Sequence, residues 1–209
     1  MKKIVFIAFN ILTISISFGQ NFEGKIIYSN TCISNIPQIT NESLSSFTGS
    51  KQEFIIKEGN YKSITNGTFF EWQLYINTSG KFYTKVTSSE TTYCIDDKKQ
   101  HKEDEVISLK LNKNVTKILD YNCDELIVKY NRKVEKYYFN SWIIIDTKIF
   151  KNEKFQNWYG YFLRSNVFPL KIIIETFAVT FESVATEIIP LKIDDKTFEL
   201  PEGVKVEEK

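Results

Sequence analysis

Hydrophobic and polar residues alternate along most of the chain, in short runs that turn residues separate. The run FEGKIIY (22–28) places alternate apolar side chains on one face, and EFIIK (53–57) begins a second series. Three turn signals follow between β-branched or aromatic stretches, at Glu58-Gly59-Asn60, Asn66-Gly67 and Ser79-Gly80. This pattern predicts an antiparallel meander over residues 53–95.

The alternation resumes after a charged loop, DDKKQHKEDE (96–105). Four further strand-like runs follow, which read EVISLKL, KILDY, DELIVKY and KVEKYYF. Turns are expected between them at Asn112 to Asn114 and at Asn131-Arg132. The chain is therefore expected to fold as an α+β protein, dominated by antiparallel sheet.

The run WIIID (142–146) departs from this alternation, because Trp142, Ile143, Ile144 and Ile145 leave no polar face. Either the sheet is covered on both sides here, or one face of this strand lines a cavity for an apolar ligand. Trp142 and Ile144 share one face, and Ile143 and Ile145 share the other. The sequence leaves open which face lines the groove, and Trp142, which is large and amphipathic, makes its own face the preferred candidate.

Two segments have helical rather than β periodicity. TNESLSSF (40–47) follows a capping residue, Thr40 or Asn41, and predicts a short helix. In residues 151–166, apolar side chains recur at helical spacing, at Phe155, Trp158, Tyr159, Phe162 and Leu163. This second helix either packs on the sheet as ordinary core or forms a hydrophobic lid over a cavity.

The N-terminus reads as a secretory signal. Two lysines precede an apolar run that is too short to span a membrane, and Ser17 and Gly19 satisfy the small-residue rule for cleavage after Gly19. Residues 20–209 are then one domain, exported to the periplasm or secreted, with no transmembrane anchor. Removal of residues 1–19 leaves 25 basic and 26 acidic residues, a balance that does not favour nucleic acid.

Catalytic and metal-binding signatures are absent from the sequence. The one histidine, His101, lies in the charged loop, and no G-x-S-x-G, P-loop or G-x-G-x-x-G motif occurs. The acidic residues of this loop lack the regular ligand spacing of a calcium loop. We therefore expect a protein that is not an enzyme and that needs no cofactor or metal.

The three cysteines, Cys32, Cys94 and Cys123, lie far apart and lack zinc-ligand spacing. An exported chain meets an oxidising compartment, so a disulfide is expected. Cys94 and Cys123 are the preferred pair because both lie near strand ends that flank the charged loop. A bond that involves Cys32, or no bond, stays open as an alternative.

Four segments together resemble the LolA-like superfamily of outer-membrane lipoprotein carriers, and most of all the secreted Bacteroidota proteins of that kind. They are FEGKIIY, TKILDYNCDELIVKY (116–130), FPLKIII (168–174) and LKIDDKTFELPEGVKV (191–206). The resemblance implies an incomplete antiparallel barrel with one or two covering helices that shelters acyl chains. It does not carry over lipoprotein transfer, because neither Arg132 nor Arg164 matches the family's buried lid arginine.

The expected function is non-enzymatic binding of a lipid or other hydrophobic ligand in the concave face of this half-barrel. The candidate groove residues are Trp142, Ile144, Trp158 and Phe162. The alternative is a β-rich protein–protein interaction module of the cell envelope, whose interior is filled by its own side chains. An apolar groove of several hundred cubic ångströms would favour the first function, and a filled interior with exposed aromatic residues would favour the second.

Overall fold

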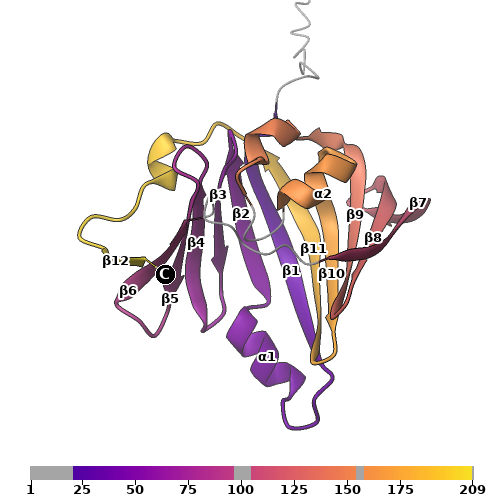
Figure 1. Cartoon of the computed structure of the whole chain (residues 1–209), viewed down its shortest axis with the longest axis horizontal. Helices are drawn as coiled ribbons and strands as arrows, with labels where there is room; N and C mark the ends of the chain where they lie inside the picture. Colours follow the sequence, from indigo (N-terminus) through magenta and orange to yellow (C-terminus); the bar gives the residue numbers. More distant parts are fainter. Residues whose placement is uncertain (1–20, 97–104, 154–157, 209) are drawn as a thin grey trace, which may run out of the picture.

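The computed structural model describes residues 21–96, 105–153 and 158–208. Its main feature is a single twelve-stranded sheet, shown in Figure 1, in the order β12-β6-β5-β4-β3-β2-β1-β11-β10-β9-β8-β7. The sheet is open, with β12 and β7 as its two edges. The mainly antiparallel α+β fold, with the sheet as an incomplete barrel, is therefore confirmed.

The strands that form this sheet have the following bounds: β1 Gly24–Ser34, β2 Lys51–Lys57, β3 Asn60–Thr65, β4 Phe70–Ile76, β5 Lys81–Val86, β6 Thr91–Asp96, β7 Val106–Ile118, β8 Tyr121–Tyr130, β9 Lys133–Ile144, β10 Val167–Thr176, β11 Val179–Pro190 and β12 Lys205–Glu208. Neighbouring strands are antiparallel except β12, which pairs with β6 in parallel. The first strand lies inside the sheet, where Gly24 pairs with Ile56 of β2 on one side and Pro190 of β11 on the other.

The predicted meander over residues 53–95 corresponds to β2 to β6, which follow one another in the sheet. The turn between β2 and β3 shows why its sequence reverses the chain. Glu58 and Gly59 have φ of 50° and 82°, the left-handed backbone of the tightest hairpins. A Cβ at position 59 would also lie 2.8 Å from Nδ2 of Asn77, so that side chain would have to shift, but it is the positive φ that favours glycine here.

The turn expected at Asn112 to Asn114 was wrong, because β7 runs through these residues as one strand. Asn112 pairs with Glu125 and Thr116 pairs with Cys123, so β7 carries two extra residues against β8. Asn114 absorbs them with a φ of 52°. Extra residues on one strand of an antiparallel pair make a bulge that bends the strand and does not reverse it. The turn expected at Asn131-Arg132, between β8 and β9, is confirmed.

The predicted short helix is α1 (Asn41–Thr48), and its cap is Thr40, whose Oγ1 accepts a hydrogen bond of 3.1 Å from the Ser43 backbone N–H. The helix predicted over 151–166 is shorter than expected. It comprises α2 (Trp158–Ser165), preceded by a 3-10 turn, η1 (Thr147–Phe150). Phe155 of the predicted stripe lies outside the described residues, as do the signal sequence and His101.

The sheet curves around the face that α2 covers, which we call the inner face. Phe82 of β5 and Leu126 of β8 belong to one hydrophobic cluster, although seven strands separate β5 from β8 in the sheet order. Two strands so far apart can share one core only if the sheet bends toward it. Tyr161 and Phe162 of α2 and Phe150 of η1 belong to the same cluster, so the helix fills the curve.

The opposite face of β2 to β6 is covered by the C-terminal strap, residues 191–198, which includes the short helix η2 (Asp195–Phe198). Ile193 and Phe198 of the strap pack with Trp72, Leu74 and Tyr83 in a second hydrophobic cluster. The sheet therefore has apolar contacts on both faces here. This two-sided burial explains the unbroken apolar run Phe54-Ile55-Ile56 in β2, where all three residues are buried.

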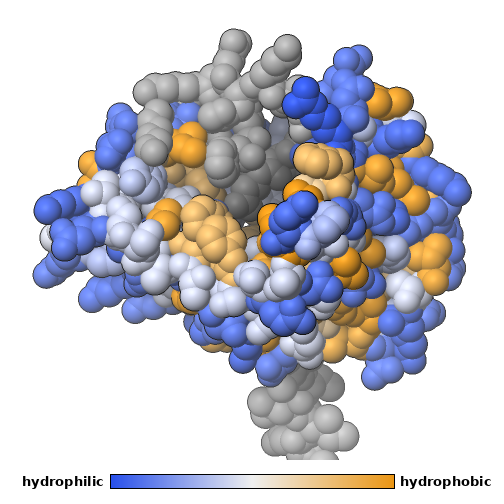
Figure 2. Space-filling model, turned by 90° about the horizontal axis from the view of Figure 1, so that it is seen from below, coloured by the Kyte–Doolittle hydropathy of each residue, from blue (hydrophilic) through white to orange (hydrophobic). Residues whose placement is uncertain are grey.

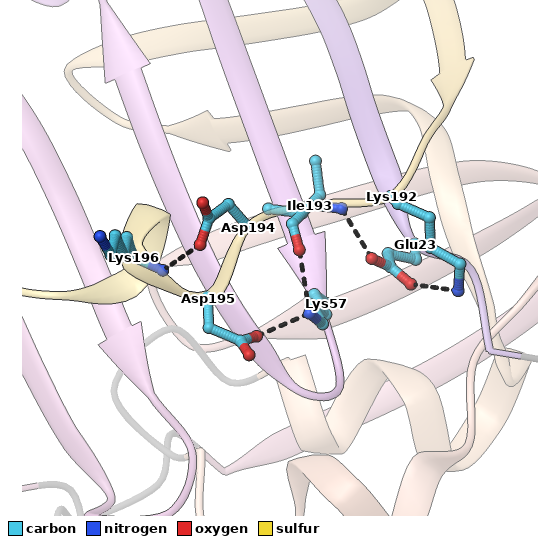
Figure 3. Close-up of polar contacts among 7 residues, drawn as sticks. All are labelled: Glu23, Lys57, Lys192, Ile193, Asp194, Asp195 and Lys196. Carbon is cyan, nitrogen blue, oxygen red and sulfur yellow. Dashed lines mark hydrogen bonds and ion pairs between the residues drawn. The ribbon is translucent and has the colours of Figure 1, made fainter.

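Polar contacts fix the strap to the edge of the first two strands (Figure 3). Glu23 accepts hydrogen bonds from the Ile193 backbone N–H at 2.7 Å and from Lys192 Nζ at 3.1 Å. Lys57 Nζ donates to the Ile193 carbonyl at 2.9 Å and to Asp195 Oδ1 at 2.6 Å. The strap is thus held by two side chains of opposite charge, Lys57 of β2 and Glu23, the residue that precedes β1.

We expect the Glu23 contacts to make the stability of the strap depend on pH. Partial burial raises the pKa of Glu23, but the Ile193 N–H and the Lys192 ammonium outweigh it, so the pKa lies below its usual 4.5. A lowered folded-state pKa contributes stability that is present above pH 4.5 and is lost as the pH falls through the folded value. Urea unfolding at pH 7 should show Glu23→Gln less stable than the wild type by about 0.5–1.5 kcal/mol. At pH 3 the difference should shrink, and a difference independent of pH would contradict this assignment.

Candidate ligand-binding site

The inner face is lined by stacked aromatic rings that seat α2. Ring centroids of Tyr137 and Tyr161 lie 4.3 Å apart, those of Phe150 and Phe162 lie 4.6 Å apart, and Phe168 of β10 lies 5.7 Å from Phe162. Offset and tilted pairs at these distances are the favourable aromatic arrangements. The helix is therefore joined to both β9 and β10 through its rings.

A buried carboxylate fastens the start of α2 to β3. Glu153 is fully buried, and its two oxygens accept hydrogen bonds from different elements. Oε1 accepts from the Tyr61 hydroxyl at 3.1 Å, and Oε2 accepts from the Trp158 backbone N–H at 2.8 Å. Trp158 is the first residue of α2, where a carboxylate is favourable because the first N–H groups of a helix lack helical acceptors. Glu153 thus positions α2 over the inner face.

Two buried tyrosines of this face, Tyr161 and Tyr137, have raised pKa values. Burial raises the pKa of Tyr161 far above its usual value of 10.0. Burial also raises the pKa of Tyr137, and so does Glu135, whose Oε2 accepts from the Tyr137 hydroxyl at 2.7 Å. Both hydroxyls stay protonated at physiological pH.

The apolar inner face continues to the open edge of the sheet, where it is not fully covered. Leu109 and Leu111 of β7 pair with Val128 and Leu126 of β8, which belong to the inner cluster. Paired residues of an antiparallel sheet point to the same face, so both leucines point inward. They are nevertheless 48% and 51% exposed. We call Leu109 and Leu111 the edge leucines.

The four predicted groove residues do not form one groove. Trp158 and Phe162 lie in or against the inner cluster, as the helix stripe predicted. Trp142 and Ile144 lie on the opposite face of β9, exposed, and Trp142 stacks on Tyr121 with ring centroids 5.3 Å apart. The assignment of Trp142 to the groove was wrong, because Ile143 next to it is the residue that enters the core. The edge leucines were missed, since their exposure depends on which strand is at the edge.

The predicted Cys94–Cys123 disulfide is also wrong, because all three cysteines are free and buried. Cys94 of β6 packs in the outer cluster under the strap, whereas Cys123 of β8 packs in the inner cluster. Their side chains therefore point to opposite faces of the sheet, on strands near its two edges. Burial raises the pKa of both thiols, which makes them less reactive.

Two hollows of different character are lined by described residues. One, of about 530 Å³, lies between α1 and β1 and is lined by hydroxyl and amide side chains, among them Asn30, Ser45 and Asn66. The other, of about 640 Å³, lies between the β8–β9 and β10–β11 turns and includes Arg132 and Phe177. Figure 2 shows the face seen from below, on which hydrophobic residues are interspersed among hydrophilic ones.

Two structural searches within the described residues gave negative results. No helix there is both long and apolar enough to cross a membrane. The same residues contain no group of three or more His, Cys, Asp or Glu side chains placed to hold a metal ion.

Comparison with known proteins gives no family. No protein-family model matches the chain, and no curated protein matches it. Among solved structures, the one described as "Structure of PNGF-II in C2 space group" is similar to 89% of this chain, with a TM-score of 0.45 and 12% sequence identity. The chain spans 31% of that structure's length.

Proposed function

We propose that the protein is an exported, non-enzymatic binder of an apolar ligand of the acyl-chain type, which lies on the inner face of the open sheet beside β7. The observation that carries the proposal is the pair of edge leucines. They extend the apolar inner face beyond the part that α2 covers, and they remain about half exposed. An apolar surface that is left uncovered on the concave side of a sheet is a favourable place for an apolar ligand.

Three further features support this proposal. The inner face is apolar from β2 to β10, so a ligand that enters beside β7 would meet hydrophobic side chains along its length. The helix α2 is held over this face by Glu153 and by its aromatic rings. The resemblance of the sequence to LolA-like carriers implies the same class of ligand and an exported protein.

The test is binding of cis-parinaric acid, a fluorescent fatty acid, to delipidated protein. The double substitution Leu109→Ser with Leu111→Ser should weaken binding by about tenfold, because each leucine loses apolar contact area with the ligand. Ile144→Ser is the matched control, since Ile144 is similarly exposed, at 42%, but lies on the opposite face of β9. This control should bind like the wild type. Native mass spectrometry of protein from its own host would then identify the natural ligand.

A second candidate function is an interaction module of the cell envelope, and the observation that favours it is the filled interior. Phe150, Phe162 and Phe168 are among the fully buried side chains of the inner cluster, while Trp142 and Ile144 stay exposed outside it. Absence of parinaric acid binding by the delipidated wild type would contradict the first proposal. Loss of a co-purifying envelope protein on Trp142→Ser substitution would support the second.

A further inference from the structure

Three loops bring exposed apolar side chains and cations together at one end of the half-barrel. Phe177, in the β10–β11 turn, is 88% exposed. The Asn35 backbone N–H donates to the Ala178 carbonyl at 2.9 Å, which places the segment after β1 beside this turn. That segment and the end of β1 expose Ile39 and Ile33. We call this part of the molecule the turn end.

The cations of the turn end come from the neighbouring β8–β9 hairpin. Lys133 pairs with Thr176, so the turn that carries Arg132 lies beside the turn that carries Phe177. Lys129, Arg132 and Phe177 line the same hollow of about 640 Å³. Within the described part of the chain, Glu175 of this hollow is paired with Lys136 at 2.5 Å, whereas neither Lys129 nor Arg132 forms an ion pair.

We propose that the turn end docks on an anionic lipid surface, with Phe177 inserted among the headgroups and Arg132 and Lys129 in contact with their phosphates. The occupant follows from the chemistry of these groups. An aromatic ring that is largely exposed at a loop tip is unfavourable in water and favourable at a membrane interface. Unpaired cations beside it attract anionic headgroups, although residues 20–209 as a whole contain 25 basic and 26 acidic residues.

This proposal rests on the proposed function and deepens it, because it names the source of the apolar ligand. Figure 2 views the molecule from the side of the turn end, which lies at the bottom of Figure 1. A protein docked in this way would hold the ends of β8 to β11, strands that contribute to the inner face, against the lipid. An acyl chain could then pass between bilayer and protein with little exposure to water.

The test is co-sedimentation of delipidated protein with two kinds of vesicle, phosphatidylcholine alone and phosphatidylcholine with about one-quarter phosphatidylglycerol. The wild type should bind the anionic vesicles more tightly, and about 0.5 M NaCl should weaken that binding by screening. Phe177→Ser should weaken partitioning by about tenfold. Arg132→Ser with Lys129→Ser should weaken it by about fivefold for each cation removed.

Matched controls separate docking at the turn end from a general loss of charge or apolar surface. Leu163→Ser removes a side chain of α2 that is 60% exposed, and Lys151→Ser with Lys196→Ser removes the same charge outside the turn end. Both controls should partition within about twofold of the wild type. The proposal is overturned if the wild type does not bind anionic vesicles, or if Phe177→Ser and Leu163→Ser partition equally.

Parinaric acid binding in vesicle-free solution keeps this result distinct from the test of ligand binding. Phe177→Ser should bind the probe like the wild type, because Phe177 lies at a turn and outside the inner cluster. A wild type that binds the probe but no vesicles refutes docking and leaves the ligand proposal standing. A wild type that binds vesicles but no probe refutes the ligand proposal and leaves docking standing.

Discussion

Replacement of Phe162 by alanine is expected to lower the free energy of unfolding by about 3–5 kcal/mol. The Phe162 ring is fully buried where α2, η1 and β10 meet, with Phe150, Trp158 and Phe168 at centroid distances of 4.6, 5.6 and 5.7 Å. Removal of the ring loses its transfer free energy and leaves a cavity between three elements. Rigid aromatic neighbours on every side limit how far that cavity can close.

The neighbouring residue provides the control for this experiment. Leu163 follows Phe162 on α2 but is 60% exposed, so Leu163→Ala should change stability by at most about 0.5 kcal/mol. Urea unfolding followed by circular dichroism gives both values. Equal losses for the two variants would mean that α2 does not face the sheet as described.

The second large effect is expected at Ile143. Ile143→Ala should lower the free energy of unfolding by about 2–5 kcal/mol, since Ile143 is 2% exposed and belongs to the inner cluster. Ile144→Ala makes the same chemical change one residue later, at a side chain that points to the opposite face of β9. Because Ile144 is 42% exposed, its truncation should cost less than about 1 kcal/mol. Comparable losses at both positions would show that both faces of this strand are ordinary core.

Local signals in the sequence predicted much of the sheet. The meander from β2 to β6 followed from turn residues such as Glu58-Gly59, whose left-handed backbone is set by a few neighbouring residues. The helix α1 followed from Thr40, whose hydroxyl accepts a hydrogen bond from the backbone N–H of Ser43 in the first turn of the helix. The helix stripe correctly placed Trp158 and Phe162 toward the inner cluster. In each case the residues that decide the local structure are close together in the sequence.

The errors occurred where distant parts of the chain decide the structure. Alternation showed that Trp142 and Ile143 point to opposite faces of β9. It could not show which of these faces is the inner one, because the inner face is defined by contacts with α2 and with β5, which are separate segments of the sequence. The cysteine pairing failed for the same reason, since Cys94 and Cys123 belong to opposite faces of the sheet. Exposure of the edge leucines depends on β7 having no further neighbour among the described strands, which only the sheet order reveals.

The position of β1 inside the sheet has a consequence for how the chain folds. The strands β2 to β6 pair with their neighbours in sequence, so this half of the sheet involves short loops that close quickly. The second partner of β1 is β11, and Gly24 meets Pro190 only after almost the whole chain has been synthesised. Closure of this pair joins the two halves of the sheet and has the largest loop entropy to overcome. Folding to the complete sheet should therefore be post-translational, with the β1–β11 pairing as its slow step.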